Sequence, residues 1–377
     1  MQIHVVQSGD TVNNIADRYD VSSDSIIYVN QLVYPYYMVI GQALLIHDDR
    51  DELERETVKV NGYAYPFISP WVLRETLPFL TELSIFSYGF TTDGDLVMPP
   101  LDDTWMIEAA EEYNVLPILT LTPFGPEGTF NNYLISVIVN DLQAQQNLIN
   151  QLEQTIMTKG FKGVDIDFEY ILAKDRDAFT EFVRNVTNSV NALGYEVSVA
   201  LAPKTSSEQG GILFEGKDFA ALGAAANHVL LMTYEWGYTY GPPMAVAPIN
   251  MVRKVVDYAI TQIPREKINL GIPNYGYDWP LPFIQGVTRA TTIGNVEAVQ
   301  IAIANGADIQ FDTLAQSPFF RYWKDGIEHE VWFEDVRSLK AKFELIKEYS
   351  LRGAGYWQIM RFFRANWILL QDMFYIV

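Results

Sequence analysis

Eight apolar segments, separated by stretches with a helical period, leave this chain few possible folds. The segments are Val58–Tyr65, Leu83–Tyr88, Leu116–Leu121, Gly163–Glu169, Glu196–Ala202, Val229–Tyr234, Ile268–Asn274 and Gly353–Gln358. Between them, residues such as Phe179, Val183 and Val186 recur at spacings that place an apolar stripe on one helix face. Strands joined by crossover helices predict a parallel sheet, and eight of them close a (β/α)8 TIM barrel. A doubly wound open sheet is the alternative, but no Gly-rich phosphate loop follows the first strand.

The spacing of these segments divides the protein into two modules. Residues 48–57 are charged and contain one large apolar residue, Leu53, which is linker composition. They separate a module of residues 1–47 from a barrel domain of residues 58–377, and we expect the two modules to move separately. Residues 280–330 are too many for an ordinary connection, so they predict an inserted lobe before the last strand.

Composition excludes several classes of function. Asp and Glu outnumber Lys and Arg by 47 to 26, and a net charge of −21 disfavours binding to nucleic acid or anionic membranes. The chain has no cysteine and four scattered histidines, so we expect neither a metal site nor a cofactor. There is no apolar run long enough for a membrane span and no signal-peptide pattern, which predicts synthesis in the cytoplasm.

The N-terminal module reads as strand, helix, helix, strand, with a turn at residues 8–11 that runs into a helix cap. It resembles a LysM domain, and the matching residues are Val5, Gly9, Asp10, Thr11, Ile15, Ala16, Tyr19, Ile26, Asn30, Leu32, Gly41, Gln42 and Leu44. The resemblance implies binding of N-acetylglucosamine polymers such as peptidoglycan and chitin. The implied groove lies near Gly9, Asp10, Thr11 and the turn that follows Asn30. Taken one by one, Gly9, Asp10 and Asn30 are better explained as turn and cap residues.

The stretch from Gly163 to Tyr170 carries three acids in alternation. Side chains alternate faces along a strand, so Asp165, Asp167 and Glu169 share one face. Three carboxylates on a buried face are costly in desolvation and repulsion, which indicates a function, since a solvated edge strand would not be flanked by helices. Barrel chemistry lies at the carboxyl end of the strands, so Glu169 should face substrate with the other two deeper. We expect the three acids to titrate as a coupled set.

This strand resembles the DGxDxDxE signature of family 18 glycoside hydrolases, with Lys162 in place of the first Asp. Alternation puts Lys162 off the acid face. Residues 232–235, 270–276 and 353–357 resemble three further strands of the family, the first with Glu235 in place of its usual Asp. The family's small-residue run on the third strand is absent, since residues 120–123 read Thr-Leu-Thr-Pro. That departure puts the shape of the cleft in doubt.

The resemblance implies retaining hydrolysis in which the substrate's acetamido oxygen attacks C1. Glu169 would protonate the leaving oxygen, Asp167 would stabilise the charged intermediate, and Asp165 would support it. Tyr234 would hydrogen-bond the acetamido group and Trp357 would stack beneath the sugar, although either ring could simply belong to the barrel core. Weaker cleft candidates are Glu235, Tyr88, Tyr275 and Trp236.

The two modules point to the same sugar. A LysM domain joined to a family 18 domain resembles the spore-associated peptidoglycan N-acetylglucosaminidases that act on cortex during germination, which implies a location in the spore coat or cortex. A chitinase or another endo-N-acetylglucosaminidase is the first alternative. An inactive glycan-binding lectin is the second, although such lectins typically lose the acid that Glu169 supplies here.

Overall fold

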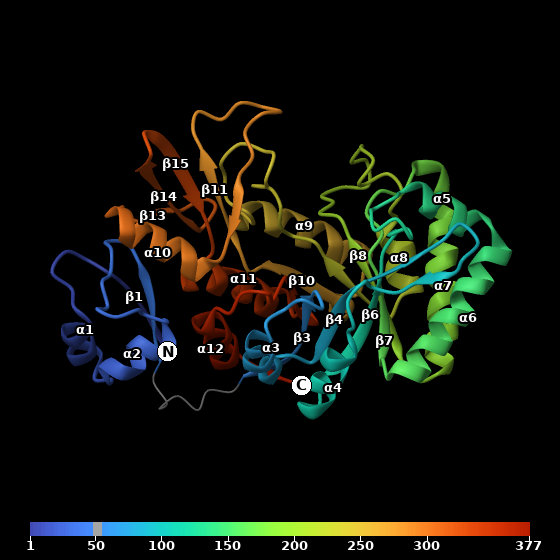
Figure 1. The fold of residues 1–377 in the computed structure, drawn as a ribbon, viewed down its shortest axis with the longest axis horizontal. Helices are drawn as coiled ribbons and strands as arrows, with labels where there is room; N and C mark the ends of the chain where they lie inside the picture. The colour runs from blue at the N-terminus through green and yellow to red at the C-terminus, as the bar shows by residue number, and fades with distance from the viewer. Residues whose placement is uncertain (48–54) are drawn as a thin grey trace.

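A closed parallel barrel forms the body of the computed structural model, which describes residues 1–47 and 55–377 (Figure 1). The eight strands are β3 (Glu56–Ala64), β4 (Glu82–Phe90), β6 (Leu116–Leu121), β7 (Gly163–Ile166), β8 (Glu196–Leu201), β9 (His228–Leu231), β10 (Ile268–Pro273) and β16 (Gly353–Trp357). The pairing of β3 with β4 closes the sheet, so the TIM barrel is confirmed. Strand β3 begins two residues inside the predicted linker, and residues 48–54 of that linker lie outside the described residues.

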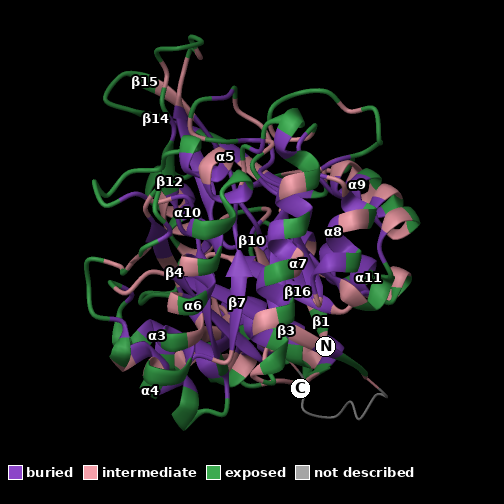
Figure 2. Ribbon diagram, turned by 90° about the vertical axis from the view of Figure 1, so that its right-hand side faces the viewer, coloured by how far each residue is buried: buried purple, intermediate pink, exposed green. Residues whose placement is uncertain are grey.

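Helices cover the outside of the barrel. The outer elements are α3 (Pro70–Thr76), η1 (Leu77–Phe79), α4 (Thr104–Glu112), α5 (Tyr133–Asn140), α6 (Leu142–Lys159), η2 (Ala173–Asp175), α7 (Arg176–Ala192), α8 (Phe219–Ala225), α9 (Ile249–Gln262), η3 (Arg265–Lys267), α11 (Val336–Tyr349) and α12 (Arg364–Met373). Figure 2 shows β7 and β10 as buried inside this layer. Phe179, Val183 and Val186 of α7 are buried as their spacing predicts. Two short strands, β5 (Leu96–Val97) and β17 (Phe374–Ile376), extend the sheet at β4 and β3. Among the described residues, no helix has both the length and the hydropathy that a membrane crossing needs.

A lobe with its own core lies between β10 and α11, which confirms the predicted insertion before the last barrel strand. It contains β11 (Gly276–Pro280), β12 (Thr291–Ile293), α10 (Asn295–Asn305), β13 (Gln310–Asp312), β14 (Ser317–Lys324) and β15 (Ile327–Trp332). The five strands pair antiparallel in the order β12-β11-β15-β14-β13. The lobe therefore extends a few residues beyond the predicted range of 280–330 at each end.

The N-terminal module has the predicted βααβ order. Its elements are β1 (Gln2–Val5), α1 (Val12–Tyr19), α2 (Ser23–Val29) and β2 (Ala43–Ile46), and the two strands pair antiparallel. The Thr11 hydroxyl caps α1 by accepting a hydrogen bond from the Asn14 N–H. Asn30 ties α2 to β2 because its side chain bonds both the N–H and the carbonyl of Leu45, at 2.7 and 2.9 Å.

This module packs against the barrel and the lobe, beside α10 and α12 in Figure 1. The Ile309 N–H of the lobe donates to the carbonyl of Ile40 at 2.8 Å. Arg364 donates to the Tyr28 carbonyl at 3.1 Å and lies over the Tyr28 ring. Gly41 has a φ of 83°, and a Cβ there would lie 1.7 Å from the Ile309 carbonyl oxygen. The expectation of separately moving modules is therefore wrong, because a backbone hydrogen bond, side-chain hydrogen bonds and close packing join them.

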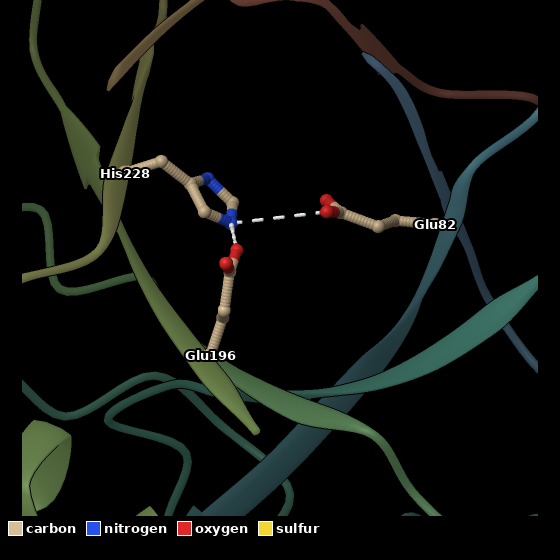
Figure 3. A group of neighbouring side chains, drawn as sticks. All are labelled: Glu82, Glu196 and His228. Atoms are coloured by element: carbon tan, nitrogen blue, oxygen red, sulfur yellow. Dashed lines mark ion pairs between the residues drawn. The ribbon is translucent and has the colours of Figure 1, made fainter. Parts of the chain in front are cut away.

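Ion pairs close the amino-terminal end of the barrel (Figure 3). The Nη2 atom of Arg352 lies 2.9 Å from Glu82 Oε1 and 3.4 Å from Glu196 Oε2. The Nε2 atom of His228 lies 3.8 and 3.6 Å from the same two carboxylates. Burial alone would raise the pKa of Glu82, but His228 and Arg352 outweigh it and hold that pKa below its ordinary value.

Candidate active site

Strand β7 carries the acid row toward the carboxyl-terminal mouth of the barrel. The strand ends three residues before Glu169, earlier than predicted, yet the Asp167 N–H still donates to the Leu121 carbonyl at 2.9 Å. Phe168 points to the helix layer and stacks on two phenylalanines of α7. The alternation therefore continues past the end of the strand and leaves Asp165, like Asp167 and Glu169, on the barrel side.

Asp165 is the deepest acid and is fully buried. The Tyr63 hydroxyl donates to its Oδ2 atom at 2.9 Å, and the Ser198 hydroxyl donates to Oδ1 at 2.5 Å. Burial raises the pKa of Asp165 to about 6, although these two hydrogen bonds oppose the shift. Asp165 is thus a buried carboxyl held by two hydroxyl donors.

Asp167 has fewer partners. Its side chain is buried, and its Oδ1 atom has no hydrogen-bond partner among the described residues. Burial, followed by the charges of Glu169 and Asp165, raises the pKa of Asp167 well above its ordinary value, while Lys217 opposes the shift. Asp167 is therefore the acid of the row whose ionisation depends most on its charged neighbours.

The acids border an aromatic cleft. Glu169 is half-buried and lines a pocket with Asp167, Pro123, Phe130, Asn132 and Tyr170. Trp357, at the end of β16, lies 5.0 Å from Phe86 and 6.1 Å from Tyr65 between ring centroids. Burial and then the charge of Asp167 raise the pKa of Tyr65 to about 12, which ties this aromatic group to the acid row. Such a floor suits the flat face of a sugar ring.

Two further residues predicted for the site, Tyr234 and Glu235, follow strand β9. Tyr234 is buried, and burial followed by the charges of Asp167 and Glu169 raises its pKa. The next residue, Glu235, accepts hydrogen bonds from the Tyr275 hydroxyl and, at 2.9 Å, from the Tyr277 hydroxyl. Burial raises the pKa of Glu235, and the two tyrosines oppose that shift. Trp236 is half-buried, and its backbone N–H donates to the Val246 carbonyl.

Comparison with known proteins agrees with this geometry. The model of glycosyl hydrolases family 18 matches residues 127–361, and the model of the LysM domain matches residues 4–47. The chain is 38% identical to the cortical fragment-lytic enzyme of Bacillus subtilis (strain 168), over 100% of this chain and 99% of that relative. The chain belongs to glycosyl hydrolase family 18. The structure of the Bacillus cereus spore cortex-lytic enzyme SleL matches with a TM-score of 0.93 at 34% identity, covering 100% of this chain and 99% of that one. A chitinase from Chromobacterium violaceum ATCC 12472 shares the fold at a TM-score of 0.77 and 23% identity, over 84% of this chain and 98% of that one.

The structure places the residues that depart from the family 18 signature, which are Lys162 and the threonines of the third strand. Lys162 faces the helix layer, 3.8 Å from a carboxylate oxygen of Glu111, as its alternation predicts. Thr120 lies opposite Asp165 on the neighbouring strand and is fully buried. Thr122 bonds the Ser87 hydroxyl at 2.9 Å. Threonines thus fill the barrel interior at positions where the family has small residues.

The prediction that Tyr88 lines the cleft is wrong. Its hydroxyl donates to Asp103 at 2.6 Å and accepts from Lys159 at 3.0 Å, and the side chain is fully buried. The structure does not bring it to the cleft. The cause is a shift in register on β4, where Ile85 and Tyr88 pair with residues only two apart on β6. Such a bulge changes which side chains face inward.

The predicted LysM residues have structural partners. Asp10 Oδ2 accepts from the Gln7 N–H at 2.8 Å and lies 2.8 Å from His4 Nε2. The Gln7 hydrogen bond, helped by His4, lowers the pKa of Asp10 in spite of its burial. Gly9 adopts a φ of 88° in the turn, and Thr11 caps α1. These contacts match the interpretation as turn and cap residues and leave sugar contact untested.

Sequence reasoning missed Tyr63, Phe86, Ser198 and Lys217. Ser198 lies directly opposite Asp165 on β8, and this register is not visible in the sequence. Tyr63 shares its predicted strand with other apolar residues, and only the closed barrel brings it to Asp165. Alternation along the first strand was the one signal that could have suggested Tyr63.

Proposed function

We propose that this glycoside hydrolase cleaves β-1,4 bonds next to N-acetylglucosamine in spore-cortex peptidoglycan, with retention of configuration and with the substrate's acetamido group as nucleophile. The observation that carries the proposal is the Asp167–Glu169 pair, which lines a cleft at the barrel mouth close to aromatic side chains. Such a pair supplies a proton donor and a negative charge at one edge of a site that can stack a sugar.

Two full-length relatives support cortex as the substrate. One is named a cortical fragment-lytic enzyme and the other a spore cortex-lytic enzyme, and each is covered almost completely by this chain. The chitinase likeness stands at 23% identity and supports the fold alone. The lectin alternative is disfavoured because the chain belongs to a hydrolase family and retains Glu169.

Glu169 is the proposed general acid. It is the acid nearest the solvent end of the row, and it lines the cleft where a leaving oxygen would lie. A positioned acid of this kind typically contributes about 10²–10⁴-fold to the rate.

Asp167 is better suited to stabilise an intermediate than to attack C1. It is buried, deeper than Glu169, and its Oδ1 atom is without a hydrogen-bond partner. The acetamido oxygen, steered by Asp167 and Tyr234 above Trp357, would attack the anomeric carbon in an intramolecular step. The positive oxazolinium-like intermediate would then lie beside the ionised Asp167, with Asp165 held beneath by Tyr63 and Ser198.

The LysM domain is proposed to hold the enzyme on its polymer near the sites of cleavage, which places the protein in the spore coat or cortex. A docked binding module raises the local concentration of polymer at the cleft without altering the chemistry. Gly9, Asp10, Thr11 and Asn30 border the proposed groove.

The test incubates the protein with purified spore cortex, vegetative wall and chitin, and identifies the released reducing ends by mass spectrometry, with Glu169→Gln as the blank. We expect N-acetylglucosamine reducing ends from cortex above the other two polymers. Release of muramic reducing ends, or faster cleavage of chitin, would refute the assignment of bond or substrate.

Proton NMR of the first-formed product tests the proposed mechanism. Retention predicts the β-anomer first, and a thiazoline mimic of the cyclised intermediate should inhibit far more tightly than the parent sugar. An inverted product, or a covalent adduct trapped on Asp167, would exclude substrate assistance.

A further inference from the structure

A buried lysine lies beside the acid row and has no part in the mechanism above. Lys217, just before α8, is 1% exposed, and its ammonium donates to the Ala200 carbonyl at 3.2 Å. Ala200 follows Val199, which lies opposite Ile166 on β7. The carbonyl that holds the ammonium is therefore level with Asp167, on the adjacent strand.

The charges around this ammonium are those of the proposed acid pair. Burial lowers the pKa of Lys217 to about 8, while Asp167 and Glu169 favour its charged form. The other titratable groups that face the two acids carry negative charge or none at neutral pH, and they are Asp165, Glu235, Tyr63, Tyr65, Tyr170 and Tyr234. Lys217 therefore supplies positive charge to a group that is otherwise acidic.

We propose that Lys217 is a positioning residue whose ammonium holds Asp167 as a carboxylate beside Glu169. This inference rests on the proposed function. A buried carboxyl such as Asp167, without a nearby cation, tends to stay protonated. The mechanism needs one proton for Glu169 to donate and one negative charge on Asp167 to face the intermediate. A fixed buried cation favours the ionised form of Asp167 over its protonated form.

The same loop contains a matched control. Lys204 is also buried, at 6% exposed, and its ammonium donates to the carbonyls of Lys217 and Phe214 at 3.2 and 3.4 Å. The charges that act on Lys204 are those of Asp218, Arg176 and Glu208, which lie outside the acid row. Lys204 therefore tests loop structure without the charge on the acid pair.

The experiment measures kcat/KM against pH on soluble cortex fragments for the full-length protein. Lys217→Met should move both limbs of the profile to higher pH by about one unit or more, because loss of a nearby positive charge raises carboxyl pKa values. Lys204→Met should keep both limbs in place whatever its effect on rate, and Lys217→Arg should restore them. An unshifted Lys217→Met profile, or an equal shift in Lys204→Met, would overturn the proposal.

A titration of the unsubstituted protein covers the case in which Lys217→Met does not fold. In ¹³C NMR of labelled lysines, the Lys217 signal, assigned through Lys217→Arg, should titrate near pH 8 and move to lower pH in Asp167→Asn. If the titration midpoint of the Lys217 signal is the same in Asp167→Asn as in the unsubstituted protein, the inference is refuted. Full activity in Glu169→Gln would instead refute the proposed function, so the two failures are distinguishable.

Discussion

The pKa values of buried carboxyls shift in opposite directions at the two ends of the barrel. At the amino-terminal end, Glu82 is 4% exposed and lies against Arg352 and His228, which hold its pKa below the ordinary value. At the mouth, burial raises the pKa of Asp165 to about 6 and raises that of Asp167 well above its ordinary value. All three carboxyls are buried. At Glu82 the positive charges outweigh the effect of burial, whereas at Asp167 the like charges of Glu169 and Asp165 add to it.

The comparison separates structural acids from acids that handle protons. A buried carboxylate with matched cations stays ionised and ties strands together. A buried carboxyl short of cations keeps its proton to a higher pH, and Asp165 and Asp167, which lie behind the proposed general acid Glu169, are of this second kind. In a chain with 47 acidic and 26 basic residues, the placement of the few cations decides which acids fall in each class.

The largest expected effect is on kcat/KM, when a glutamate is replaced by glutamine at the mouth of the barrel and, for comparison, at its amino-terminal end. Glu169→Gln removes the proposed proton donor and should lower kcat/KM by at least ~100-fold, with oligosaccharide binding retained. Glu196→Gln, at the amino-terminal end, should leave kcat/KM within about twofold of wild type. Steady-state kinetics with a binding measurement on soluble cortex fragments checks both. Equal losses in the two variants would mean that the ends do not differ in function.

The next effect is on stability. Arg352→Met leaves Glu82 buried without its main cation and should lower the free energy of unfolding at pH 7 by about 3 kcal/mol. The depressed pKa of Glu82 stabilises the native protein above the unfolded pKa, and this contribution is lost as pH falls through the folded pKa. The difference between variant and wild type should therefore shrink between pH 7 and pH 4. Urea unfolding at both values checks it, and a constant difference would show that charge is not the cause.

The smallest effect concerns an interface without titrating groups. Gly41→Ala places a methyl group against the Ile309 carbonyl and should destabilise the LysM contact by about 2 kcal/mol, beyond the strain of its positive φ. Gly9→Ala is the matched control, because it has a similar φ and nothing within 4 Å. Hydrogen exchange at the Ile309 amide should speed up only in Gly41→Ala, and the pH profile of hydrolysis should not move in either. A shifted profile would mean that the mouth is not the sole source of the proton chemistry.

Much of this molecule could be predicted from local sequence. The eight strands, the βααβ module and the acid row each rest on periodicities of two or 3.6 residues. These periodicities can be read from the sequence, as with Asp167 and Glu169 on either side of the outward-facing Phe168. The inserted lobe could be inferred from length alone. The predictions that were wrong, and the residues that were missed, depend on contacts between segments far apart in the sequence.

Tyr88 shows the first kind of failure, because a single bulge on β4 reverses the facing that alternation predicts. The docked LysM domain shows the second, since the linker composition gave no sign that Gly41 would meet Ile309. Lys217 shows the third, because a lone lysine in a loop carries no pattern that ties it to an acid on another strand. Register, bulges and docking arise from tertiary packing, which sequence periodicity does not encode.

The difference between the two ends can be measured directly by ¹³C NMR titration of labelled Asp and Glu carboxyls in the wild-type protein. We expect the Asp167 signal, identified by its absence in Asp167→Asn, to titrate well above the ordinary range for aspartate, and the Asp165 signal to titrate near pH 6. The Glu82 signal should complete its titration below the ordinary range for glutamate. An Asp167 that titrates in the ordinary range for aspartate, or a Glu82 that titrates above the ordinary range for glutamate, would contradict the difference between the two ends of the barrel.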